Sequence, residues 1–304
     1  MERNGRDPIA AVQASAAEGK RKNSLDCLKG YFPGFRGLLA RTLLRRCVYG
    51  AAADLGALFC YGHFDVLDTR RGEYIKAYAR NVFCTPLLMG DLVATFNLVE
   101  NLPAEVKQEE KGGGYMVTAT PGKEPEEELS ARPRPKTLPC MPGDIRLEAC
   151  PECGVPIVPM DFRDYRWGLE EGTITGNATG RRMASMGMER LAAGSRELEA
   201  ELGEDITRII LAAQREHTKS SLAKEEFERG YPYLRHLFAL RGSGNLVSYD
   251  AQEDATQAVV ENAVPPLLAA GTPPGAYGLL TGRESGCRYD GGDDAILSVE
   301  ARSR

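Results

Sequence analysis

The sequence predicts an α+β protein that contains two copies of one module, each an antiparallel sheet packed with helices. Three observations predict this class: alternating apolar runs bracketed by glycines, amphipathic helical stripes, and an internal similarity at a constant spacing. The chain has 304 residues, of which 42% are hydrophobic and 27% are charged. This composition is typical of globular proteins, and the length is enough for two ordinary domains.

The internal repeat is clearest between residues 80–101 and 261–282. Asn81 and Asn262 lie 181 positions apart. The pairs that keep this spacing without a gap are Gly90 and Gly271, Phe96 and Tyr277, and Leu98 and Leu279. Before each segment an apolar helix ends in a glycine turn, and after each segment two alternating runs flank further glycines, which indicates a hairpin. Each copy is therefore expected to run helix, strand, strand, short helix, hairpin.

The composition along the chain divides it into four expected regions. Residues 1–23 read as a flexible N-terminal tail, because their basic cluster Lys20-Arg21-Lys22 lies in a polar stretch. Residues 24–120 form the first module, with a shorter helical part. Residues 121–165 are a linker rich in proline and glutamate, with a cysteine knuckle. Residues 166–304 form a complete second module that opens with a hairpin at 166–182.

A series of short motifs follows in order through the second module. The motifs are Gly-Arg-Arg at 180–182, Glu-Leu-Gly at 201–203, Gly-Ser-Gly-Asn-Leu at 242–246, Val-Glu-Asn at 260–262, a helix with Gly271, Gly275 and Leu279, Gly-Arg-Glu-Ser-Gly-Cys at 282–287, and Gly-Gly-Asp-Asp at 291–294. In this order they resemble the 4-vinyl reductase domain family, a ligand-binding module related to the sensor domains of aromatic-responsive regulators. The resemblance extends over most of the second module and part of the first.

The resemblance implies a pocket between sheet and helices that holds a small apolar or aromatic molecule. The candidate ligand-binding residues are His236, Tyr233, Phe238, Arg241 and Cys287. The aromatic cluster around His236 has an alternative interpretation as core packing, and Arg241 at a helix end is equally suited to the negative helix terminus or to an anionic ligand group. Family members often carry a further cysteine in the last strand, near Cys287, and residues 295–299 of this chain contain none.

The sharpest local motif is the knuckle Cys150-Pro151-Glu152-Cys153-Gly154, which has the spacing of half a zinc ribbon. Cys140 is a candidate third ligand, and the fourth is open among His63, His217, an acid and a residue of a partner. A plain reduced pair and a redox pair are the alternatives. The redox interpretation requires a helix here, which nearby Pro156 and Pro159 disfavour.

The remaining features exclude several functional classes. The net charge of −5 and the absence of a basic stripe argue against nucleic acid and anionic membranes as partners. No run approaches the ~20 apolar residues that span a bilayer, and the N-terminus has no secretory pattern. The eight cysteines are therefore expected to be reduced, in the cytoplasm. No phosphate loop, nucleophile elbow or metalloprotease motif is present, so no catalytic residue is assigned.

The leading functional hypothesis is a sensory or regulatory protein that binds a small molecule and is read by a partner protein or within a homodimer. One alternative is an enzyme or accessory factor of tetrapyrrole or aromatic metabolism that uses His236, Cys287 or the Cys150–Cys153 pair. Another alternative is a zinc-dependent regulator that binds nucleic acid, against which the acidic balance counts.

Overall fold

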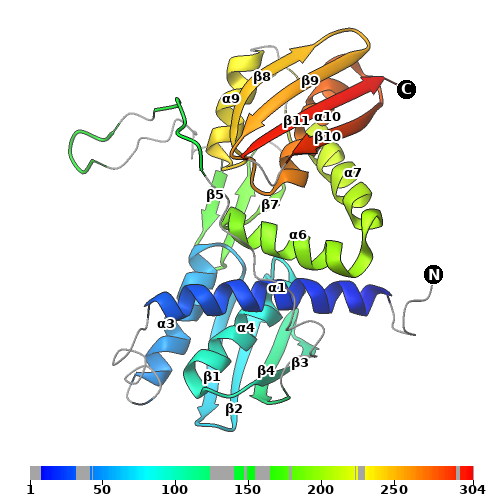
Figure 1. Ribbon diagram of the computed structural model, residues 1–304. Helices are drawn as coiled ribbons and strands as arrows, with labels where there is room; N and C mark the ends of the chain where they lie inside the picture. The colour runs from blue at the N-terminus through cyan, green and yellow to red at the C-terminus, as the bar shows by residue number, and fades with distance from the viewer. Residues whose placement is uncertain are drawn as a thin grey trace. The chain divides into compact units, whose positions relative to one another are not determined.

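The computed structural model describes residues 8–31, 42, 44–123, 140–146, 149–154, 165–177, 180–222, 224, 230–291 and 295–303 (Figure 1). The predicted α+β class and the duplication are confirmed. The chain divides into two compact units, and neither is continuous in sequence. The first comprises residues 1–134 and 163–201, and the second comprises residues 135–162 and 202–304.

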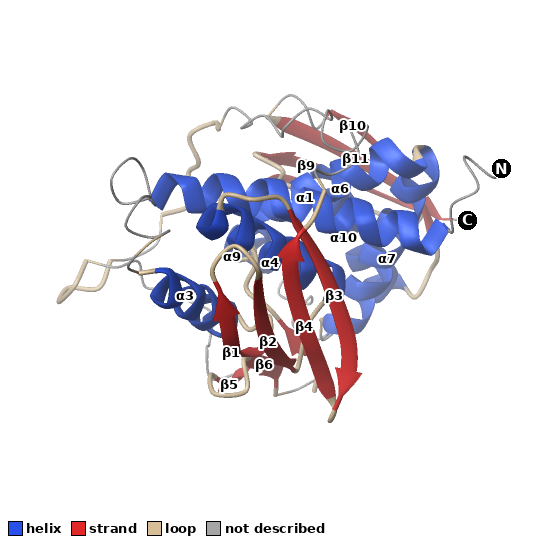
Figure 2. Cartoon of the chain, turned by 90° about the horizontal axis from the view of Figure 1, so that it is seen from below, coloured by secondary structure: helices blue, strands red, loops and turns tan. Residues whose placement is uncertain are grey.

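The first unit is built around a four-stranded antiparallel sheet. Its main elements, in chain order, are α1 (Pro8–Tyr31), α3 (Arg45–Leu58), β1 (His63–Arg70), β2 (Tyr74–Arg80), α4 (Thr85–Glu100), β3 (Ala104–Lys111) and β4 (Gly114–Pro121). The strands pair in the order β1-β2-β4-β3. Helices α1 and α4 pack against each other (Figure 2). Alternation along β2 buries Ile75, Ala77 and Ala79 on the face that meets the helices.

The second unit repeats these elements in the same order. They are α7 (Glu204–Ser221), α9 (Tyr231–Leu240), β8 (Asn245–Ala251), β9 (Ala255–Glu261), α10 (Pro266–Thr281), β10 (Ser285–Gly291) and β11 (Ile296–Ser303). The strand order is β8-β9-β11-β10, which is the topology of the first sheet. Helix α7 packs on α10 as α1 packs on α4.

Backbone conformation confirms the spacing that the sequence predicted. Asn81 and Asn262, at the ends of β2 and β9, have φ angles of 52° and 55°. The left-handed residues that close α4 and α10, Asn101 and Gly282, are again 181 positions apart, with φ angles of 57° and 73°. Asparagine and glycine tolerate this conformation, so the repeat preserves these turns.

The predicted flexible tail is wrong from Pro8 onward, and the first module is not a shortened form. Residues 8–31 form α1, the counterpart of α7. The basic cluster is not solvated either, since Lys20 and Lys22 are buried. The Lys20 ammonium lies 3.1 Å from Asp91 of α4, and that of Lys22 lies 2.8 Å from Glu197. Arg21 pairs with the nearby Glu18, whereas the two lysines pair with acids distant in the sequence, which the local composition does not show.

The predicted hairpin at 166–182 is present, as β5 (Tyr165–Gly168), β6 (Thr173–Gly176) and the short β7 (Arg182–Met183), followed by α6 (Met188–Leu202). These elements belong to the first compact unit, whereas the sequence analysis grouped them with the second module. Arg182 makes the attachment. Its Nη2 donates to the carbonyl oxygens of Cys60, Asn81 and Gly172, at 3.2, 2.6 and 2.9 Å.

The packing of α1 on α4 depends on Gly90. A Cβ atom at this position would lie 2.3 Å from the carbonyl oxygen of Ala17 and 2.8 Å from the Cβ of Lys20. Only hydrogen allows the two helix backbones to approach this closely. Gly271 has the same role in the second unit, where a Cβ would lie 2.7 Å from the Cβ of Gln214.

We expect Gly90→Ala to destabilise the protein by about 1–3 kcal/mol, because the added methyl group forces α1 away from α4. The matched control is Gly50→Ala in α3, where a Cβ would meet nothing within 4 Å. That substitution should stabilise by about 0.5–1 kcal/mol, since alanine is the better helix former. Chemical denaturation followed by circular dichroism measures both changes. Equal effects of the two substitutions would contradict the close helix contact.

Candidate ligand-binding cavity

The first module contains a cavity of about 620 Å³, partly open to solvent at Leu55 and Phe83, between α1, α3, α4 and the inner face of its sheet. This volume lies within the roughly 300–1,000 Å³ typical of small-molecule sites. Most of the lining is aliphatic or aromatic. Its aromatic side chains are Tyr49, Phe59, Tyr61, Phe64 and Phe83, from α3, the turn after it, β1 and the segment before α4. Such walls favour a flat, largely apolar molecule.

The cavity exists because α3 presents small residues where its counterpart α9 presents large ones. The two helices end in matching backbone hydrogen bonds: the amide of Tyr61 donates to Gly56, and that of Ser243 donates to Phe238, both at 2.9 Å. Gly56 therefore corresponds to Phe238, and one turn earlier Ala52 corresponds to Leu234. Phe238 and Leu234 are each 1% exposed in the core of the second unit. Gly56 and Ala52 line the cavity instead, and the Phe64 ring of β1 packs against Gly56, where a Cβ would lie 2.6 Å from it.

A compact polar group lies on one wall of the apolar cavity. It comprises Lys20 and Ser24 of α1 and Asp91 and Thr95 of α4. The Asp91 carboxylate is paired with the Lys20 ammonium and accepts a hydrogen bond from the Ser24 hydroxyl. The Lys20 ammonium also lies 4.6 Å from the centre of the Tyr61 ring, a cation–π contact.

A second set of polar groups closes the cavity behind Tyr49. The Glu100 carboxylate accepts hydrogen bonds from Arg45 at 2.8 Å and from the Tyr49 hydroxyl at 2.9 Å. Burial, followed by the neighbouring Glu100 charge, raises the pKa of Tyr49 far above its usual value. The Tyr49 hydroxyl thus stays protonated and engaged with Glu100, and the phenyl ring is the part that lines the cavity.

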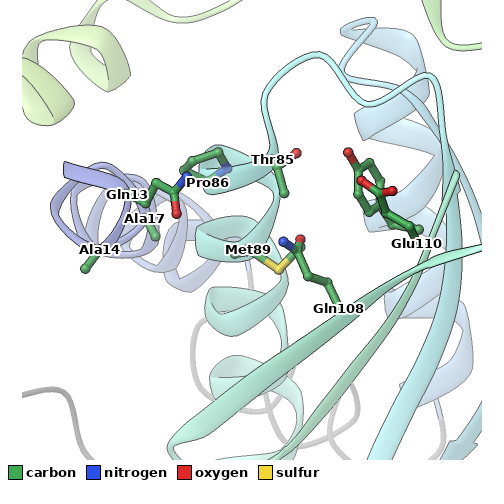
Figure 3. Close-up of a pocket in the computed structure, with 9 residues that line it drawn as sticks. Gln13, Ala14, Ala17, Thr85, Pro86, Met89, Gln108 and Glu110 are labelled. Carbon is green, nitrogen blue, oxygen red and sulfur yellow. The ribbon is translucent and has the colours of Figure 1, made fainter. Parts of the chain in front are cut away.

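A separate groove of about 570 Å³ lies between α1, the start of α4 and the β3–β4 hairpin (Figure 3). The lining of this groove includes Gln13, Thr85, Met89, Gln108 and Glu110. Gln13, Gln108 and Glu110 are exposed to solvent. The groove has no enclosed apolar wall, so the cavity beneath α3 is the stronger candidate for a binding site.

The residues that the sequence analysis selected for ligand binding lie in the second unit, and none lines either of these two spaces. Phe238 is part of the core, and Tyr233 packs against it. His236 is half-buried on α9, and Arg241 is the residue that ends this helix. Cys287 on β10 donates to the carbonyl of Ala270, and burial raises the pKa of its thiol to about 11. Their role in binding stays a prediction.

The cavity residues themselves were missed. Alanine and glycine on a helix look the same in sequence whether another element fills the adjacent space or leaves it open. One available signal was the comparison of α3 with α9 across the repeat, which sets Ala52 against Leu234 and Gly56 against Phe238. The Phe64 ring, at the position of Leu246, occupies the space beside Gly56, so the exchange of Leu234 for Ala52 is the clearer sign of an unfilled core.

The cysteine knuckle forms a tight turn around the Cys150 sulfur. The amide of Gly154 donates to the carbonyl of Cys150 at 2.8 Å, and Gly154 adopts a φ of +71° that favours glycine. The backbone amides of Cys153 and Glu152 and the Cys153 thiol hydrogen-bond the Cys150 sulfur, and together they lower the pKa of Cys150. Within the described parts of the chain, no three potential ligands cluster, so Cys140 does not lie with this pair.

The chain has few detectable relatives. No protein-family model matches it, and no curated protein matches it. Among solved structures, the chain is similar to the crystal structure of the phenol-responsive sensory domain of the transcription activator PoxR with phenol. The TM-score is 0.36 at 15% sequence identity, over 46% of this chain and 85% of that one. This likeness is too distant to assign a function, and the proposals below rest on the residues of this chain.

None of the helices that the structure describes is both long enough and apolar enough to span a bilayer.

The two cysteines of the second unit with opposite pKa shifts should differ in reactivity. Only a thiolate attacks iodoacetamide. Near neutral pH, Cys150 should therefore be alkylated much faster than Cys287, whose pKa of about 11 leaves almost no thiolate. Labelling followed by peptide mass spectrometry measures both rates, and denatured protein, in which the rates should converge, is the control. Faster labelling of Cys287 in the folded protein would contradict the geometry.

Proposed function

We propose that the protein is a small-molecule-binding protein of sensory type, built from two modules of the 4-vinyl reductase kind, and that its ligand occupies the cavity of the first module. One observation carries this proposal: an apolar cavity, partly open to solvent, stands where the sister module has a filled core. Side chains around an empty space lose their packing contacts, so an unfilled cavity of this size reduces stability unless a ligand fills it.

The lining supports binding more than catalysis. Its two strongest acid–base groups, Lys20 and Asp91, are paired with each other. The described histidines, His63, His217 and His236, do not line the cavity. His63 instead lies 2.9 Å from the carboxylate of its neighbour Asp65. What remains is an apolar surface with one small polar group, which is the usual composition of a recognition site.

The elements around the cavity offer a route for a signal. Met186, between β7 and α6, contributes to the lining. Lys22 of α1, two residues after Lys20, pairs with the buried carboxylate of Glu197 on α6. The chain then continues from α6 through Gly203 into α7 of the second unit. We propose that a ligand shifts α1 and α6 together, and that a partner protein or a second copy of the chain senses this shift.

The neutral fluorescent naphthalene prodan tests the cavity directly. We expect one prodan molecule to bind per chain with a blue-shifted emission. Ala52→Leu introduces the side chain of its counterpart Leu234, which fills this space in the second module. The substitution should weaken prodan binding about ten-fold. The same substitution should raise the stability of the unliganded protein by about 0.5–2 kcal/mol, because it fills a void.

Ala213→Leu is the matched control for this experiment, because Ala213 lies exposed on α7. It should leave prodan binding unchanged. Wild-type protein that does not bind prodan, or Ala52→Leu protein that binds it equally well, would contradict the proposed site.

We further propose that the knuckle Cys150–Gly154 contributes two thiolates to a structural zinc site. Tetrahedral zinc takes four ligands, so two more come from residues outside the described parts of the chain or from a second copy. Such a site would tie the segment between the two modules into a fixed turn. The hydrogen bonds to the Cys150 sulfur support this proposal, because they stabilise the thiolate that zinc requires.

Protein purified under anaerobic conditions should therefore contain zinc. The double substitution Cys150→Ser/Cys153→Ser should remove it, while Cys47→Ser, at an exposed cysteine of α3, should retain it. Elemental analysis with native mass spectrometry gives the content, and the ratio of zinc to chains separates an intramolecular site from one shared by two copies. Metal-free wild-type protein, or zinc retained by the double variant, would contradict the site.

A further inference from the structure

The polar wall of the cavity also indicates which ligands the site accepts, an inference that rests on the proposed function above. We propose that Lys20, Ser24 and Asp91 form a recognition group that accepts a hydrogen bond from the O–H or N–H group of an uncharged, otherwise apolar ligand. The acceptor is the carboxylate of Asp91.

The same helix contact in the second unit holds a different set of residues. Gly90 and Gly271 are equivalent, and the residues whose Cβ atoms lie closest to them are Lys20 and Gln214. The same register places Thr218 at the position of Ser24, and Thr272 follows Gly271 as Asp91 follows Gly90. Thus a charged triad in the first unit corresponds to a neutral triad in the second.

The neutral triad shows what the helix contact itself requires. The side-chain amide of Gln214 donates to the Thr272 hydroxyl at 3.1 Å and to the Thr218 hydroxyl at 3.4 Å. The Gln214–Thr272 hydrogen bond joins α7 to α10 without any charge, and the Gln214–Thr218 contact lies within α7. Burying an ion pair costs desolvation energy that often exceeds the attraction between its members. Charges at Lys20 and Asp91 are therefore more than α1 and α4 need in order to pack.

The exposed part of the charged triad decides the ligand chemistry. The Lys20 side chain is 1% exposed, whereas the Asp91 side chain is 28% exposed and lines the cavity. A carboxylate has about four acceptor positions, and the known contacts of Asp91 with Lys20 and Ser24 leave acceptor capacity. A ligand that reaches Asp91 must consequently donate a hydrogen bond.

The charge balance of the wall favours an uncharged ligand. Lys20 and Asp91 neutralise each other, so a charged ligand would bring an unpaired charge into an apolar space, at a high desolvation cost. The aromatic walls then hold the apolar body of the ligand.

Two naphthalenes of nearly the same shape test this inference in the wild-type protein. 2-Naphthol is uncharged near neutral pH and carries a hydroxyl donor, and 2-methoxynaphthalene replaces the donor by a methyl ether. We expect 2-naphthol to bind about ten-fold or more tightly, because a hydrogen bond to a charged group is lost with the ether. Calorimetry measures both affinities. Equal affinities would overturn the recognition group while leaving the cavity proposal intact.

The repeat supplies the matching variant. Lys20→Gln/Ser24→Thr/Asp91→Thr installs the triad that already joins the equivalent helices of the second unit. This variant should bind 2-methoxynaphthalene as the wild type does and should bind 2-naphthol no better than the ether. A retained preference for 2-naphthol would overturn the inference. Failure of both compounds to bind the wild type would instead count against the proposed function. The wild-type comparison decides the inference even if the variant does not fold.

Discussion

The side chains that one helix places against the sheet decide whether a module has a filled core or a cavity. Helix α9 places Leu234 and Phe238 against its sheet, and both are almost fully buried. Helix α3 occupies the same place in the repeat with Ala52 and Gly56; the Phe64 ring lies against Gly56, and the space beside Ala52 is part of the cavity. Since protein interiors pack as densely as organic crystals, a module that keeps such a void gives up contacts that its sister module retains. The topology is shared, and the difference between core and cavity arises from these side chains.

The second constraint is the close approach of the paired helices at Gly90 and Gly271. Because a methyl group at either position would meet the neighbouring helix, the register of α1 on α4 and of α7 on α10 is fixed. That register determines which side chains of α1 meet those of α4. It thereby places Lys20 and Ser24 against Asp91 at the edge of the cavity. A glycine that serves packing in both units thus also positions the polar wall in one of them.

The parts of the fold that depend on local signals could be predicted from the sequence. Alternation and glycine turns identified the hairpins, and the constant spacing of Asn81 and Gly90 from their counterparts identified the duplication. The attachment of the β5–β7 hairpin could not be predicted, because Arg182 bonds to carbonyl groups of Cys60 and Asn81, which are about a hundred residues away. For the same reason α1 resembled a solvated tail: the acids that pair with its lysines lie on α4 and α6.

The candidate site was harder to predict than the fold, and the reason is physical. Sequence analysis searches for groups that carry chemistry, such as His236 or Cys287, and both lie in the unit with the filled core. A binding cavity is defined as much by what is missing, and a missing side chain leaves no motif. Duplication removes this difficulty, because one copy shows what a filled module contains. On this reasoning the second module is the packed reference, and the side chains of α1, α3 and α4 that differ from it shape the cavity.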